Sequence, residues 1–222
     1  MLQERRDKTT EGFMAEYVTS RGMRMTLSVM LASFSISAGQ EVRNPSLRTD
    51  LLAHLKDDQD VRHVHFADKL QRGLKLDTSD ARAINAVDST NLRWIKLVIL
   101  RYGWPGITLV GPDGEQAAFL LIQHADRDTA FQFQCLQLLQ QAFSSGETTG
   151  EHLAMLTDRT EVAAGRPQIY GSQAFLLDGR IVFRPIRDSS TVDVRRFRLG
   201  LMPIMEYKSF LDSMYTSSGN KK

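Results

Sequence analysis

The chain has 222 residues, of which 42% are hydrophobic and 24% are charged, as in ordinary globular proteins, and it contains no apolar run of the ~18 residues that a membrane-spanning helix needs. Its 28 basic and 26 acidic side chains leave a net charge of only +2, which argues against a nucleic-acid partner. The single cysteine, Cys135, excludes an intramolecular disulfide and a cysteine-based metal cage.

Residues 1–39 are predicted to be an N-terminal extension that ends in a signal-peptide-like segment. Residues 1–20 are polar, and Arg21–Arg24 then precede an apolar stretch, Met25–Ala38, that ends in small residues. A short positive region, an apolar stretch and small residues are typical of secretory signals. We therefore expect export to the periplasm or the extracellular space; if residues 21–39 are instead an ordinary helix, the protein is cytoplasmic.

Residues 44–216 are predicted to form one globular, mainly α domain (α+β) with a single small β-hairpin near residues 173–184. From Asn44 to Leu76, apolar residues recur at spacings of three and four, which is typical of an amphipathic helix. A second apolar stretch within this range, closed by Gly73, is either a separate helix or the end of a longer one. The leucines that set the first pattern are Leu47, Leu51, Leu52 and Leu55.

The middle of the chain predicts three further helices. Asp88 is a natural N-cap for a helix that ends before Gly103, because its side chain can accept from the free amides of the first turn. Gly111–Gly114 indicates a turn. The nearly continuous apolar run Glu115–Ala125 predicts a buried helix, because its alanines and its length favour helix over strand. Asp128 is predicted to cap the helix that follows, over residues 129–143.

The C-terminal third changes in character. A short helix is expected over residues 150–162. Ala174–Leu177 and Arg180–Phe183 flank Asp178-Gly179, which is typical of a β-hairpin with a type I′ turn. A final helical segment, residues 191–215, is interrupted near residues 200–203.

Polar residues gather at the corner between the second and third of the middle helices. Gln123, His124 and Asp126 follow a buried helix directly, and a histidine near a carboxylate can act as a general acid or base because its pKa lies near neutrality. We therefore expect His124 and Asp126 to be catalytic, with His124 as the acid or base and Asp126 orienting it. The predicted ligand contacts are Gln123, Arg159, Gln168, Tyr170 and Gln173.

These residues suit a hydrolase or transferase that acts on a small anionic or sugar-like ligand, since arginine binds anions and the amide and hydroxyl groups orient a ligand. The alternative is a non-catalytic binding or scaffolding module in which His124, Asp126 and Arg159 satisfy one another and fix the helices. For Asp158-Arg159, a structural ion pair is favoured over a site. The sequence does not specify an oligomeric state.

Other chemistries have weak support in the sequence, and no metal or cofactor is predicted. His63 and His65 would point apart on a helix, and no third ligand is evident. Ser172 does not lie in a Gly-x-Ser-x-Gly nucleophile motif. Cys135 falls on an apolar helical face, where a buried, unreactive thiol is the expected outcome.

A series of short motifs runs from Asp88 to Tyr207, and their order and spacing make the chain similar to a bacterial domain family of unknown function. The resemblance covers a little over half of the chain and implies a shared fold without an established activity. It also implies export, because members often look exported or lipid-anchored, although no lipobox cysteine is present here. The matching residues are Gly103-Trp104-Pro105, Val110-Gly111, Gln123–Asp126, Asp128, Phe131-Gln132, Leu156–Arg159, Gly165–Gln173, Pro185–Asp188, Arg195-Arg196 and Gly200-Leu201.

Overall fold

A computed structural model describes residues 42–67, 69, 77–177 and 180–216 of the chain. This part of the chain is mainly helical and contains one two-stranded antiparallel sheet, so the predicted fold class is confirmed. The signal-like segment lies outside the described residues, as do Gly73 and the Asp178-Gly179 turn. The elements in order are α2 (Pro45–Arg62), the π-helix η2 (His63–Ala67), α4 (Thr78–Tyr102), α5 (Ile107–Gln123), α6 (Thr129–Ser144), α7 (Gly150–Ala163), β1 (Ala174–Leu177), β2 (Arg180–Phe183), the 3-10 helix η3 (Ser189–Thr191), α8 (Val192–Arg198) and α9 (Ile204–Thr216).

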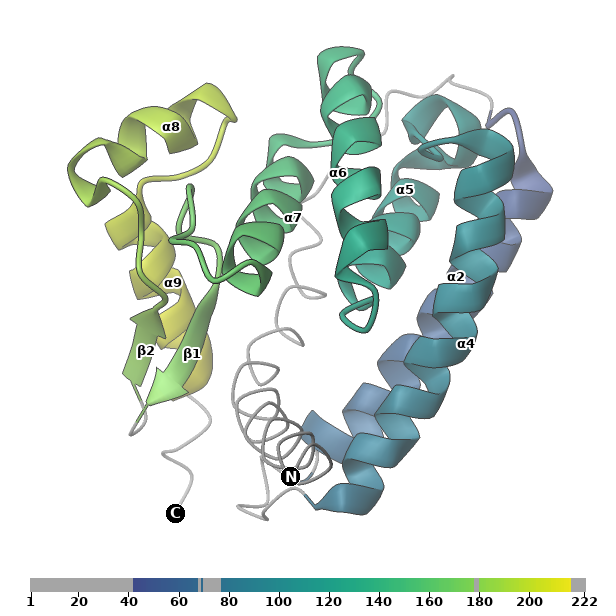
Figure 1. Ribbon diagram of the computed structural model, residues 1–222, viewed down its shortest axis with the longest axis horizontal. Coiled ribbons are helices and arrows are strands. Elements are labelled where there is room, and N and C mark those ends of the chain that lie inside the picture. Colours follow the sequence, from purple (N-terminus) through teal and green to yellow (C-terminus); the bar gives the residue numbers. More distant parts are fainter. Residues whose placement is uncertain (1–41, 68, 70–76, 178–179, 217–222) are drawn as a thin grey trace, which may run out of the picture.

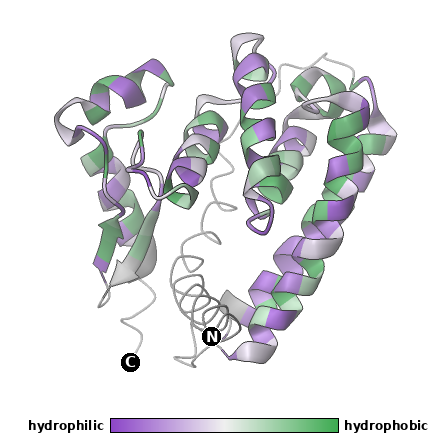
Figure 2. Ribbon diagram, viewed as in Figure 1, coloured by the Kyte–Doolittle hydropathy of each residue, from purple (hydrophilic) through white to green (hydrophobic). Residues whose placement is uncertain are grey.

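The helices form two connected groups (Figure 1). Helices α2 and α4 lie side by side as a long pair and pack against α5, which is followed by α6 and α7. Polar and apolar residues alternate along α2 and α4 (Figure 2), as expected for helices that bury one face. Leucine, isoleucine and phenylalanine side chains from these helices form the main core, in which Leu51, Ile95, Phe119 and Leu156 are almost fully buried.

The C-terminal group is built on the hairpin. Strand β1 pairs with β2 in antiparallel orientation, with Ala174 opposite Phe183. The sheet buries Ala174 and Ile181 against α9, where Tyr207 and Leu211 complete a second, smaller core. The last helical segment is divided into α8 and α9, in agreement with the interruption predicted around Gly200.

Several predicted helix ends are confirmed by their hydrogen bonds. The Asp128 carboxylate accepts from the amide of Phe131 at 2.9 Å and caps α6. Gly103 follows α4 with a φ of 67°, a conformation that glycine adopts without steric cost. The kink in α5 at Gly111, with a φ of 76°, lies where the sequence indicates a turn, and Pro112 follows it.

The predicted start of α4 is wrong. The helix begins at Thr78, where Asp77 and Asp80 form a capping box, and Asp88 lies in its middle. The hydroxyl of Ser89 donates to the carbonyl oxygen of Asn85 at 2.7 Å, so a serine beside Asp88 is accommodated inside the helix. The Asp88 carboxylate is buried and bonded to Arg62, which is a tertiary contact that a helix pattern does not reveal.

Candidate functional site

The corner between α5 and α6 carries the polar residues that the sequence singles out. Gln123 is the last residue of α5, His124 is its C-cap, and Asp128 begins the next helix. The side chains of Gln123 and His124 lie inside the protein, and each residue is only 3% exposed. The corner is therefore a buried polar centre in this conformation.

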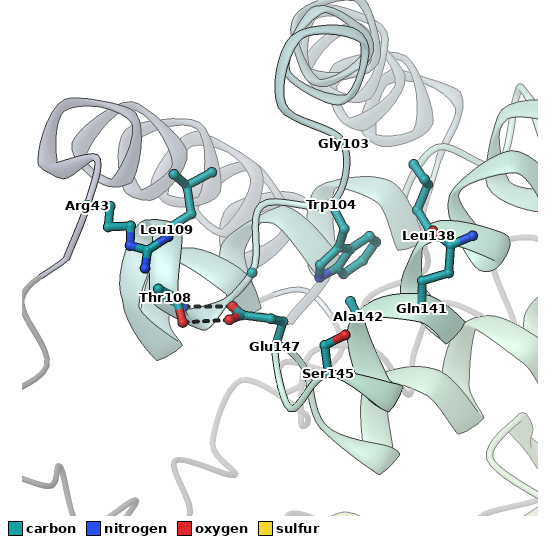
Figure 3. Close-up of a pocket in the computed structure, with 11 residues that line it drawn as sticks. Arg43, Gly103, Trp104, Thr108, Leu109, Leu138, Gln141, Ala142, Ser145 and Glu147 are labelled. Atoms are coloured by element: carbon teal, nitrogen blue, oxygen red, sulfur yellow. Dashed lines mark hydrogen bonds between the residues drawn. The ribbon is translucent and has the colours of Figure 1, made fainter.

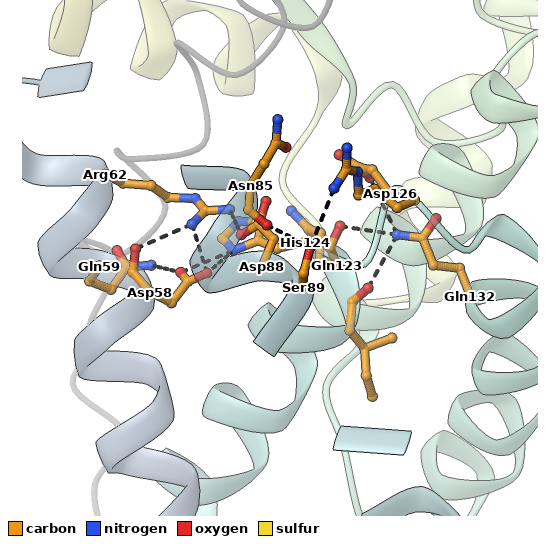
Figure 4. A network of polar contacts seen from close by, with 12 residues as sticks. Asp58, Gln59, Arg62, Asn85, Asp88, Ser89, Gln123, His124, Asp126 and Gln132 are labelled. Atoms are coloured by element: carbon orange, nitrogen blue, oxygen red, sulfur yellow. Dashed lines mark hydrogen bonds and ion pairs between the residues drawn. The ribbon is translucent and has the colours of Figure 1, made fainter. Parts of the chain in front are cut away.

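Asp58 of α2 holds the imidazole of His124. The two carboxylate oxygens of Asp58 lie 2.9 and 3.0 Å from His124 Nδ1. Arg62, one turn further along α2, lies 2.8 Å from Asp58 Oδ1 and donates to Asp88 of α4 at 2.7 Å. Figure 4 shows this guanidinium reaching toward both carboxylates. The carboxylate that orients His124 is thus Asp58, whereas the sequence points to Asp126.

The charge states in this group follow from burial and contact. Burial acts to raise the pKa of Asp58, but His124 and Arg62 outweigh it and hold that pKa below its ordinary value. Burial, followed by the Arg62 charge, lowers the pKa of His124, so the imidazole is neutral near pH 7. Because an ionised carboxylate can only accept, we assign the ring proton to Nδ1 and a lone pair to Nε2.

Asp126 lies in the same corner and pairs with Arg159 of α7. The guanidinium donates from Nε to one oxygen of Asp126 at 2.7 Å and from Nη2 to the other at 2.6 Å. The Gln132 amide donates to the carbonyl oxygens of Ile122 and Gln123, both at 3.1 Å, and thereby fixes the end of α5 on α6. The bidentate ion pair between Asp126 and Arg159 agrees with the alternative prediction that these two residues fix the helices to one another.

Polar side chains from α2, α4, α6 and α7 and from the α5–α6 corner form a set that we call the corner network. Its members are Asp58, Arg62, Asp88, Asn91, Gln123, His124, Asp126, Gln132 and Arg159. Six of its buried atoms have no hydrogen-bond partner within the described part of the chain. The donors are Arg62 Nε, Asn91 Nδ2 and Arg159 Nη1, and the acceptors are Gln123 Oε1, His124 Nε2 and Gln132 Oε1. Buried polar atoms are normally matched, so these six atoms are exceptions to the usual pattern.

Asp58 and Arg62 were missed by the sequence reading, although a signal was present. They continue the buried stripe of α2 that begins with Leu47 and Leu51, because successive buried residues lie four or seven positions apart on one face of the helix. Asp88 likewise interrupts the buried stripe of α4. A charged residue on the apolar face of a helix must have a buried partner, and this rule would have found the group.

Gln168 and Gln173 stabilise the loop that leads to the hairpin. The Gln168 side chain is fully buried; it accepts from the amide of Gln173 at 2.7 Å and donates to the carbonyl oxygens of Gln173 and Arg184, each at 2.8 Å. Gln173 donates weakly to Met155, at 3.5 Å. The two glutamines thus form backbone contacts within this loop, whereas the sequence suggested ligand contacts.

Asp158 organises the same loop from α7. Its carboxylate accepts from the amides of Ile169, Tyr170 and Ser172 at 2.6 to 2.9 Å and from the Ser172 hydroxyl at 2.9 Å. The predicted ion pair between Asp158 and its neighbour Arg159 is therefore wrong, because each side chain has a separate partner. Burial raises the pKa of the half-buried Tyr170, whose backbone is the part bound to Asp158.

A second buried cluster surrounds Glu115 of α5. His152 Nδ1 lies 2.9 Å from one oxygen of Glu115, and Trp104 and Thr148 donate to the other at 3.2 and 2.5 Å. His152 also stacks on Phe119, with ring centroids 4.0 Å apart. This cluster therefore contains a second buried histidine–carboxylate pair.

A surface pocket of about 490 Å³ lies beside Trp104 (Figure 3) and is lined in part by Arg43, Leu109, Gln141 and Glu147. Glu147 accepts from the amide and the hydroxyl of Thr108, which occupies both of its oxygens. None of the predicted site residues lines this pocket.

Cys135, His65 and the acidic side chains were the remaining candidates for a reactive or metal-binding centre. Burial raises the pKa of Cys135 to about 12, so its thiol stays protonated. His65 pairs with Asp80 at 3.0 Å. Within residues 42–67, 77–177 and 180–216, no three histidine, cysteine, aspartate or glutamate side chains group as a metal site. No helix in the same ranges is long and apolar enough to cross a membrane.

The family model for a family of unknown function, DUF6624, matches residues 45–219, from the start of α2 to beyond α9. The chain belongs to the DUF6624 family. The match spans both helix groups of this DUF6624 domain and the whole of the corner network. Neither the curated proteins nor the solved structures contain a match to the chain.

Proposed function

We propose that this DUF6624 protein is a hydrolase or transferase in which His124 is the general acid–base and Asp58 positions it. The observation that carries the proposal is the imidazole itself. Its Nδ1 is held by Asp58, and its buried Nε2 has no partner in the described part of the chain. A neutral histidine fixed in this way presents a basic lone pair, which is what proton abstraction requires.

The proposed reaction is an ordinary hydrolysis with one proton transferred to and from His124. Nε2 takes a proton from water while the water oxygen forms a bond to the electrophilic centre of the ligand. The resulting imidazolium, stabilised by the Asp58 carboxylate, then returns the proton to the leaving oxygen as its bond breaks. In a transferase, a second ligand hydroxyl replaces the water. Because His124 is 3% exposed, the ligand must enter through a more open conformation.

Replacing His124 with glutamine tests the proposal, because a glutamine amide can still donate to Asp58 while lacking a basic lone pair. The purified protein is incubated with a small-molecule extract of the cells that produce it, and mass spectrometry follows every ion that is consumed. We expect wild type to consume at least one ion and His124→Gln to consume it about 10²–10⁴-fold more slowly.

The matched control is His152→Gln, because His152 is also a buried histidine paired with a carboxylate. We expect this variant to consume the same ion at nearly the wild-type rate. Equal consumption by wild type and His124→Gln would refute the proposal, as would an extract in which wild type consumes nothing.

The second candidate is a non-catalytic binding or scaffolding module. Two observations support it. Asp158 and Gln168 use their side chains to bind backbone amides of the loop before β1, and the bidentate pair between Asp126 and Arg159 joins the α5–α6 corner to α7. In this case His124→Gln lowers the thermal midpoint by several degrees and changes no conversion.

We also propose that the protein is exported after removal of residues 1–39. The support is the apolar stretch Met25–Ala38 that follows Arg21–Arg24. N-terminal sequencing of the mature protein from a secreting bacterial host is expected to give a first residue near Gly39. Recovery of the protein with an intact Met1 would contradict export by this signal.

A further inference from the structure

The corner network has more unmatched hydrogen-bonding groups than a proton transfer at His124 requires. Besides His124 Nε2, five buried atoms lack partners within the described residues. They come from α2, α4, α5, α6 and α7, so they do not belong to one frayed element. The number and mixture of these groups indicate the chemistry of the molecule that they would bind.

The fixed charges of the network argue against an anionic ligand. Arg62 is shared between Asp58 and Asp88, and Arg159 is bound on two sides by Asp126. The network therefore contains three carboxylates and two guanidinium groups, with one negative charge in excess. An anion placed there would meet this excess in a buried setting, where charge interactions are strong.

The unmatched atoms also argue against a ligand that only donates or only accepts. Guanidinium and amide nitrogens need acceptors, whereas the two glutamine oxygens and His124 Nε2 need donors. A hydroxyl group is both donor and acceptor, so hydroxyl groups can match both kinds of atom. An ammonium group would leave the three nitrogen donors unmatched.

We infer that the corner network binds an uncharged ligand with several hydroxyl groups, of the sugar or polyol class. The inference rests on the proposed function in one respect, namely that this ligand is the molecule on which His124 acts. It narrows the anionic or sugar-like ligand expected from the sequence to the neutral class.

Thermal unfolding with defined probes tests the ligand class. The neutral probes are glucose, N-acetylglucosamine, sorbitol and myo-inositol, and the charged probes are gluconate and glucose 6-phosphate. At concentrations about tenfold above Kd, a neutral probe is expected to raise Tm by ~3–6 °C, and the charged probes are expected to have no specific effect.

Two glutamine variants separate specific binding from the general stabilisation that sugars give to all proteins. Gln123→Met removes an unmatched buried acceptor while keeping the side-chain length, and we expect it to lose the specific part of the Tm rise. Gln137→Met changes an exposed glutamine of α6 and is expected to respond like wild type. If Gln123→Met does not fold, His124→Gln is titrated with the same probes, and it is expected to bind the neutral probe more weakly because it removes the unmatched acceptor Nε2; unchanged binding would overturn the inference.

The possible results test the ligand class and the proposed catalysis by His124 separately. A Tm rise with the charged probes only, or no specific rise with any neutral probe, overturns the ligand class. If extract consumption still depends on His124 in that case, the proposed catalysis stands. Specific binding of a neutral probe without any His124-dependent consumption supports the ligand class and rejects catalysis.

Discussion

Replacing Asp58 with alanine is expected to lower the free energy of unfolding by about 3–5 kcal/mol, because it breaks a buried ionic group from one side. Asp58 is fully buried, and its loss removes the acceptor for His124 Nδ1 and one of the two carboxylates that neutralise Arg62. Urea unfolding followed by circular dichroism measures the change. The same variant should lose the proposed activity, since His124 is no longer oriented.

The control for this prediction lies on the same helix. Asp60 pairs with Lys56 at the surface of α2, where both side chains are more than half exposed. Exposed pairs contribute little, so Asp60→Ala is expected to unfold at nearly the wild-type urea concentration. Equal effects of Asp58→Ala and Asp60→Ala would contradict the importance assigned to the corner network.

Asp158→Ala is expected to destabilise the protein by a similar amount, about 3–5 kcal/mol, through a different mechanism. The carboxylate accepts four hydrogen bonds from residues 169–172, and its removal leaves buried amides without acceptors. Amide hydrogen exchange measures the loss of stability in the loop of residues 169–172. The amides of Ile169, Tyr170 and Ser172 should exchange faster in the variant by a larger factor than the amides of α2.

Glu161→Gln is the matched control, because Glu161 lies one turn further along α7 and pairs with exposed Arg166. It should leave exchange at residues 169–172 unchanged. If both variants increase exchange equally, the loop depends on the charge of α7 in general and not on the Asp158 contacts.

The sequence correctly predicted those helix ends and strands that depend on interactions between residues close together in the chain. Asp128 caps α6 and Gly103 ends α4 through bonds to residues within four positions, so a short window contains the information. The hairpin strands were also predicted correctly, because the two apolar segments and the Asp178-Gly179 sequence between them are adjacent in the chain.

The contacts of the candidate site were only partly predictable because they are not local. His124 was singled out from its place at a helix corner, but the carboxylate that it contacts comes from a helix 66 residues earlier. Asp88 resembled a cap because an aspartate followed by serine and threonine is typical of one, whereas its partner Arg62 lies 26 residues away. The loop glutamines were expected at the ligand because polarity alone does not reveal that Gln168 binds backbone atoms.

The distance along the chain between Asp58 and His124 also has a consequence for synthesis. A ribosome adds about 5–20 residues per second, so Asp58 is made roughly 3–13 s before the histidine that it binds. During that interval Asp58 and Arg62 have no α5 to cover them, and water must solvate both charges. The long α2–α4 pair therefore acquires its final burial only when the middle of the chain has been translated.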